Sequence, residues 1–190
     1  MKKVTFFLAS LLMFCSCSSD NGKDSDPKPQ KLELSSEITE TTLLAVRDVV
    51  SLGYDSRGTL NEIECKTVIT PLVTDGKNIQ TQILEQLSDS VSEDDIEFFQ
   101  NLSDEELAAL SFLVYTITPT DTNVSSRGID TNRLLHCASV AVGYDAIKKL
   151  AVGEVVTAVT IRQALLAIGK RYLGYIGFAI MIYEFVECVG

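Results

Sequence analysis

The feature that most constrains the fold is an apolar stretch without any charge, residues 173–183, near the end of the 190-residue chain. Lys170 and Arg171 stand before it and Glu184 after it, so it is shorter than the roughly 20 apolar residues that a transmembrane helix needs. A helix that is apolar on all sides is found in a protein core or in lipid. We therefore expect a buried core helix, with a membrane-active segment or a dimerising face as the alternatives.

Two amphipathic helical patterns come before this stretch, within residues 132–190. Apolar residues recur in both at spacings of three and four, which places them on one face of a helix. Glycines separate the patterns, so we expect a hydrophobic bundle of three or four helical segments. The apolar faces comprise Leu134, Cys137, Ala138, Ala141, Tyr144, Ile147 and Leu150 in the first pattern, and Ala158, Ile161, Leu165, Ile168 and Tyr172 in the second.

Residues 1–17 have the layout of an export signal. Two lysines, a short apolar run and small polar residues follow one another in that order. Cys17 follows small Ser16, whereas Cys15 follows bulky Phe14, which favours processing immediately before Cys17. We expect this segment to be removed from the mature protein.

The signal resembles those of bacterial lipoproteins, in which the lipidated cysteine becomes the first mature residue. This resemblance covers about the first two dozen residues and implies that Cys17 carries acyl chains. Ser18 after the cysteine implies the outer membrane, and Asp20, Asp24 and Asp26 resemble the surface-export signals of some Gram-negative lipoproteins. An ordinary cleaved secretory signal is the alternative.

Composition and charge divide the mature chain into regions. Residues 18–31 contain no apolar side chain and predict a flexible tether. Residues 18–130 carry 8 Lys and Arg against 22 Asp and Glu, net −14, whereas residues 131–190 carry 6 against 4, net +2. The acidic region argues against a nucleic-acid partner and is typical of a solvated exterior. We expect contact with the membrane through the lipid anchor, and with a protein partner of unknown identity.

Residues 32–118 form an acidic helical domain with signals for four helices. Ser36 is placed as an N-cap, and Gly53 stands where the same helix is expected to end. An apolar stripe marks a second helix, and two capping boxes mark the starts of two more. The first helix turns Ile38, Leu43, Val46 and Val50 inward; the stripe is Ile79, Ile83 and Leu87; the boxes are Ser92 with Asp95 and Ser103 with Glu106.

The pattern does not decide the structure of residues 65–73. Val68, Ile69 and Val73 favour a strand. Pro71 stands among them, and proline is found in sheets only at edge strands and disrupts helix interiors. An edge strand, an extended segment and a kinked helix all remain open here.

Residues 119–131 have the composition of a linker, rich in Pro, Asp, Asn, Ser and Gly. The bond between Arg127 and Gly128 lies within it, in a context accessible to a trypsin-like protease. Cleavage after Arg127 would release residues 128–190, which contain the hydrophobic helical domain, residues 132–190, as a separate piece.

Three thiols remain once Cys15 leaves with the signal and Cys17 is acylated. In an oxidising compartment we expect one pair, Cys137 with Cys188, because both lie on apolar faces of the same domain. Three full antiparallel helices would hold these cysteines at opposite ends, so the pairing requires that the first helix break at Gly143. Cys65 paired with either of the others is the alternative.

The ionisable residues give no support for an enzyme. His136, the lone histidine, stands next to Cys137, but neighbours on a helix point about 100° apart and do not face each other. Glu184 and Glu187 resemble the polar exit of a core helix more than an acid and base pair. We predict no catalytic residue, no metal site and no cofactor; an envelope hydrolase would require converging carboxylates in a cleft.

Together these patterns predict an all-α protein with two small helical parts, the second closed by the disulfide between Cys137 and Cys188. We expect it in the outer membrane, lipid-anchored through Cys17 and surface-exposed, as a non-enzymatic binding or structural module. The alternative is a precursor whose acidic part shields a membrane-active antimicrobial peptide, released by cleavage after Arg127.

Overall fold

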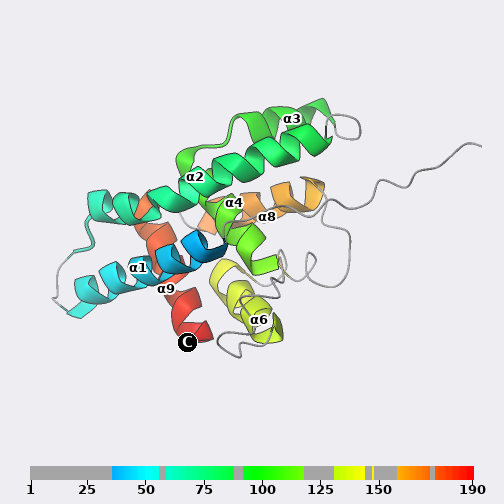
Figure 1. The fold of residues 1–190 in the computed structure, drawn as a ribbon. Coiled ribbons are helices and arrows are strands. Elements are labelled where there is room, and N and C mark those ends of the chain that lie inside the picture. Colours follow the sequence, from blue (N-terminus) through cyan, green and yellow to red (C-terminus); the bar gives the residue numbers. More distant parts are fainter. Residues whose placement is uncertain are drawn as a thin grey trace, which may run out of the picture.

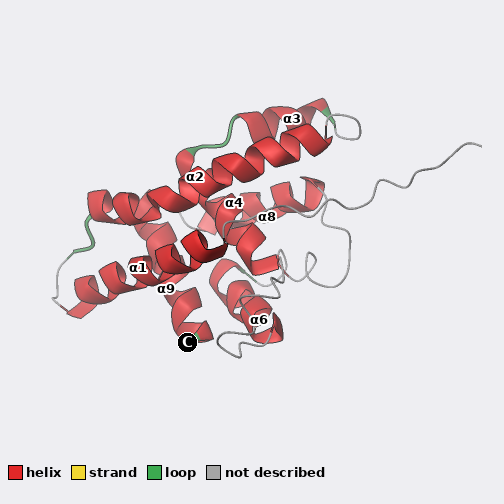
Figure 2. Cartoon of the chain, viewed as in Figure 1, coloured by secondary structure: helices red, strands yellow, loops and turns green. Residues whose placement is uncertain are grey.

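The computed structural model describes residues 36–55, 59–87, 92–117, 131–143, 147, 158–171 and 174–190. Every element within these ranges is an α-helix, which confirms the all-α prediction (Figures 1 and 2). Cys17, the tether and the bond after Arg127 lie outside the described residues. The helices are α1 (Ser36–Asp55), α2 (Glu62–Leu87), α3 (Glu93–Gln100), α4 (Asp104–Ile117), α6 (Thr131–Val142), α8 (Ala158–Arg171) and α9 (Gly174–Val189).

Helix α2 contains the segment that the sequence pattern left undecided. Cys65, Ile69 and Leu72 recur at helical spacing and are fully buried, whereas Pro71 is exposed. A proline inside a helix costs about 3 kcal/mol, because it lacks an N–H group and its ring crowds the preceding turn. Burying the isoleucine and the leucine, at about 1.5–3 kcal/mol each, offsets that cost. Tertiary packing therefore overrides the local signal.

The end of α1 differs from the sequence expectation. Leu43, Val46 and Val50 are buried as predicted, but the helix continues to Asp55, so the prediction that it ends before Gly53 was wrong. A Cβ atom on Gly53 would lie 2.5 Å from a methyl carbon of Leu60. The glycine makes room for the chain that returns from α1 to α2, rather than terminating the helix.

The starts of α3 and α4 are capped as predicted. The Ser92 hydroxyl accepts the Asp95 amide proton at 3.3 Å and donates to the Asp95 carboxylate at 2.6 Å. Ser103 and Glu106 form the reciprocal pair: the Glu106 amide donates to the Ser103 hydroxyl at 3.3 Å, and the Ser103 amide donates to the Glu106 carboxylate at 2.8 Å. The three bonds that involve backbone amides satisfy protons that the start of a helix leaves without an intrahelical acceptor.

Helices α2 and α4 pack against each other at very short range. A Cβ atom on Gly76 would overlap the Leu107 carbonyl oxygen and lie 2.6 Å from the carbonyl carbon. One residue earlier, buried Asp75 accepts a hydrogen bond from the Ser111 hydroxyl at 2.8 Å. Glycine at position 76 therefore permits the approach of the two backbones that this polar contact requires.

Two parts of the chain contribute to one hydrophobic core: the acidic half, with helices α1 to α4, and the C-terminal half, with helices α6, α8 and α9. Helix α9 lies against α1, α2 and α4 of the acidic half as well as α6 of its own half (Figure 1). The Phe112 ring on α4 packs perpendicular to the rings of Phe178 and Phe185 on α9. The centroid of the Phe112 ring lies 6.4 Å from that of Phe178 and 5.0 Å from that of Phe185. Such perpendicular aromatic pairs add to the stabilisation from area burial alone. The apolar stretch that dominates the sequence is thus a core helix, as expected.

The helices α8 and α9 come nearest to a membrane span. Among the described helices, none is long and apolar enough to cross a bilayer by itself. Taken together, the segments 158–169 and 174–189 reach the required length and hydropathy, but they are bent by 106° at the break between them.

Candidate functional site

The disulfide joins the start of the C-terminal half to its end. Cys137 on α6 and Cys188 on α9 are bonded, with their Cα atoms 5.6 Å apart, which confirms the predicted pairing. Helix α6 ends at Val142, and Gly143 adopts a φ of 109°, so the break that the pairing requires is present. Arg133 adds a hydrogen bond of 3.1 Å from its guanidinium to the Cys188 carbonyl oxygen.

A charged contact connects the two halves at α3 and α8. Arg162 Nη1 donates to Asp95 Oδ1 at 2.7 Å, and the Asp95 side chain is only 8% exposed. The Arg162 guanidinium also lies over the Phe98 ring, 5.1 Å from its centroid. The hydrogen bond from the Ser92 hydroxyl and that from Arg162 hold the pKa of Asp95 below its ordinary value. Asp95 is therefore a fixed negative charge at neutral pH.

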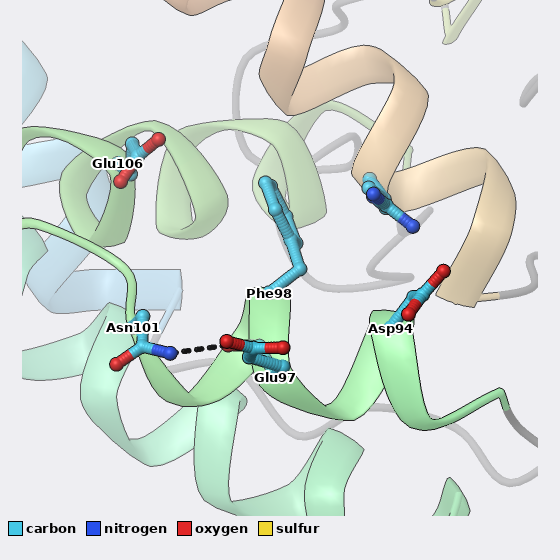
Figure 3. A pocket seen from close by; sticks show the side chains of 6 residues that line it. Asp94, Glu97, Phe98, Asn101 and Glu106 are labelled. Carbon is cyan, nitrogen blue, oxygen red and sulfur yellow. Dashed lines mark hydrogen bonds between the residues drawn. The ribbon is translucent and has the colours of Figure 1, made fainter.

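Next to this contact lies a concavity of about 350 Å³ between α3, α4 and α8. Figure 3 shows that α3 contributes most of its labelled lining, and that Glu106 reaches it from α4. The Asn101 side-chain amide donates to the Glu97 backbone oxygen at 2.9 Å, which closes the end of α3. The lining residues are Asp94, Glu97, Phe98, Asn101, Glu106 and Arg162.

The electrostatics of this concavity are acidic. Three of its lining side chains are carboxylates, while the charge of Arg162 is paired with Asp95 beneath it. Glu106 uses one oxygen to accept the Ser103 amide proton, so part of its hydrogen-bonding capacity serves the cap of α4. A surface of this kind attracts cations and repels anions.

The residues that the sequence singled out for chemistry lie apart from this concavity. His136 is exposed on α6, and the sulfur of its neighbour Cys137 is held in the disulfide, so it is not a free thiolate. Glu184 and Glu187 are exposed on α9, at the polar side of a core helix. Among the described residues, no group of three or more Cys, His, Asp or Glu is arranged to hold a metal ion.

Cys65 is a free, fully buried thiol on α2. Burial, followed by the charge of Glu64, raises the pKa of this thiol above its ordinary value. A protonated and enclosed thiol is a poor nucleophile, so this cysteine acts as a small core side chain.

The concavity and the ion pair were not found by sequence reasoning. The capping box pointed to Asp95, but nothing in the spacing of residues connects it with Arg162, which lies 67 positions further on. A weak signal existed: Arg162 is the only charged residue between Ala158 and Gly169 of α8.

Comparison with known proteins does not place the chain in a family. No family model matches it, and no curated protein or solved structure is significantly similar to it.

Proposed function

We propose that this protein is a lipid-anchored, surface-exposed component of the outer membrane that acts as a non-enzymatic binding or structural module. The lipoprotein-type signal supports anchoring through Cys17, and the polar tether supports a body held away from the lipid head groups. The observation that carries the proposal is the shared core. Because α9 is buried by helices of both halves, the folded body needs no lipid to cover it.

The anchor is tested by mass spectrometry of the protein purified from membranes. We expect the mature chain to begin at Cys17, with acyl chains on its sulfur and amino group. Cys17→Ala should move the protein from the membrane to the soluble fraction, whereas Cys15→Ala, the matched control, should leave it membrane-bound. An unmodified sulfur at position 17 would contradict the proposal.

Surface exposure is tested separately on intact cells. A protease that cannot enter the cell should degrade the anchored protein, while a periplasmic protein of the same cells stays intact. Protection of this protein under those conditions would place it on the inner side of the membrane.

A second function is favoured by one observation, the apolar character of α8 and α9 taken together. In this proposal the protein is a precursor, and cleavage after Arg127 releases a disulfide-closed peptide that attacks membranes. Residues 131–190 carry a net charge of +2, which suits anionic lipid. A fragment of residues 128–190 with its disulfide intact should then leak dye from liposomes. An insoluble or inert fragment would favour the first proposal.

A further inference from the structure

The acidic half has an apolar surface, formed by α1, α2 and α4, against which α9 packs. Helices α1, α2 and α4 all contact α9, and the contacts come from side chains that are buried on both sides. On α9 these include large aromatic and aliphatic groups over its whole length. The buried residues of α9 are Tyr175, Phe178, Ala179, Met181, Ile182 and Phe185.

Phe112 marks the centre of this surface. It is fully buried on α4, and its ring packs perpendicular to both Phe178 and Phe185, which lie two turns apart on α9. At the beginning of α9, the Lys66 ammonium group of α2 lies 5.1 Å from the centroid of the Tyr175 ring. Burial raises the pKa of the Tyr175 hydroxyl, so this tyrosine stays neutral in the contact.

The two halves also complement each other in charge. Residues 18–130, which include the acidic half, carry a net charge of −14, whereas residues 131–190 carry +2. The ion pair between Asp95 and Arg162 places one opposite-charge contact directly across the boundary, with the carboxylate buried. Complementary charge speeds the association of two protein surfaces, and buried aromatic contacts slow their dissociation.

We propose that the acidic half is a helix-binding partner for the C-terminal half, and that it keeps holding that half after the connecting chain is cut. The inference deepens the second candidate function and rests on it only for the identity of the final target, a lipid surface. Cleavage would then be insufficient for membrane attack, because the apolar face of α9 stays covered until the pieces dissociate. The acidic half would act as an inhibitor in addition to a shield.

An affinity threshold makes this testable. A linker as short as residues 119–131 holds the two halves at an effective concentration in the millimolar range, and cutting it removes that advantage. At about micromolar protein, the cut pieces stay together only if their dissociation constant is well below about 1 μM. Several fully buried aromatic and aliphatic side chains, together with a buried charged contact, are the features that give such affinity.

The experiment uses the mature chain, residues 17–190, with Cys17→Ala, so that neither the apolar signal nor acyl chains can cause vesicle binding. A recognition sequence for a specific protease is inserted between residues 117 and 131, and the protein is cut with its disulfide oxidised. We expect the two pieces to elute together in gel filtration and to leave dye inside vesicles of phosphatidylethanolamine with a minority of phosphatidylglycerol. Separation of the pieces without denaturant would overturn the proposal, and so would leakage by the intact cut complex.

Matched variants test whether α9 is the element that is held. Phe185→Ala removes a buried ring that contacts Phe112. It should raise the dissociation constant of the two pieces on the order of 100-fold. Leu166→Ala removes an apolar side chain from an exposed position of α8 in the same half and should leave retention unchanged. Equal elution of the two cut variants would contradict the proposal. Circular dichroism of each uncut variant checks folding, and Phe178→Ala serves if Phe185→Ala does not fold.

The outcomes separate this inference from the function on which it draws. If the Phe185→Ala pieces dissociate and the freed C-terminal half does not leak dye, the precursor function fails while the helix-binding role stands. If the wild-type pieces fall apart on cutting, the helix-binding role fails whatever the fragment does to vesicles.

Discussion

Arg162 of α8 donates a hydrogen bond to Asp95 of α3 across 2.7 Å, joining residues that are 67 positions apart in the chain. The hydroxyl of Ser92, the N-cap of α3, donates to the other carboxylate oxygen of Asp95 at 2.6 Å, so one carboxylate contacts both the cap of α3 and the C-terminal half. The arginine side chain is 34% exposed, which means that water screens part of the interaction. Local capping and long-range assembly thus depend on the same carboxylate.

Asp95→Asn should lower the free energy of unfolding by about 1–2 kcal/mol, because it weakens a charge-assisted hydrogen bond to a partly exposed partner. Urea denaturation measures the difference. Glu93→Gln, the same chemical change two residues earlier at an exposed site, should alter stability by less than about 0.5 kcal/mol. Equal losses in the two variants would show that Asp95 acts only through the overall charge of the helix start.

The same carboxylate gives the protein part of its acid sensitivity. The pKa of Asp95 is lower in the folded protein than in the unfolded chain, because Ser92 and then Arg162 stabilise the charged form. Its contribution to stability is therefore complete above a pH of about 4 and declines as the pH falls toward the folded pKa. Between those limits, stability measured by urea denaturation should fall less steeply in Asp95→Asn than in the wild-type chain.

Two glycines should respond in opposite ways to alanine. Gly76→Ala should destabilise by about 1–3 kcal/mol, because the new methyl group overlaps the Leu107 carbonyl where α2 meets α4. Gly169→Ala, inside α8 with nothing within 4 Å of the new carbon, should stabilise by about 0.5–1 kcal/mol through helix propensity. Thermal unfolding of both variants compares them, and stabilisation by Gly76→Ala would show that the helices can separate freely.

Removing the disulfide should lower the free energy of unfolding by about 4 kcal/mol in the chain-entropy model, because the cysteines lie 51 positions apart. The double variant Cys137→Ala with Cys188→Ala tests this by urea denaturation. A reducing agent should destabilise the wild-type chain in the same direction and leave the double variant unaffected. An effect of the reducing agent on the double variant would point to a different cysteine pair.

Cys65 should react slowly with a thiol reagent in the folded protein. Its side chain is fully buried and burial raises the pKa of the thiol, so both access and thiolate population are low. Labelling followed by mass spectrometry should show modification of this residue only after addition of urea. Fast labelling of the folded chain would show that the segment near Pro71 opens readily.

Much of the fold could be predicted from residue spacing alone. The apolar faces of α6 and α8, the uncharged apolar run of α9, the two capping boxes and the disulfide all depend on short sequence patterns or on a geometric condition, the break at Gly143. Those features reflect local chemistry, so they are visible in the sequence.

The parts that could not be predicted are set by contacts between distant helices. Pro71 stays in a helix that buries Ile69 and Leu72, and Gly53 lies inside α1 with Leu60 close beside it. The acidic concavity exists only because α8 is brought against α3 and α4. No spacing within a single segment reports such an arrangement.

The central claim is that the acidic half and the hydrophobic C-terminal half form one core. Hydrogen exchange of the uncut, oxidised chain tests it most directly, by comparing the amides of α4 with those of α9. If both helices unfold only together, their most protected amides should exchange through the same opening and show the same free energy. If the amides of α9 exchange more than about tenfold faster than those of α4, the C-terminal half opens by itself and the account is contradicted.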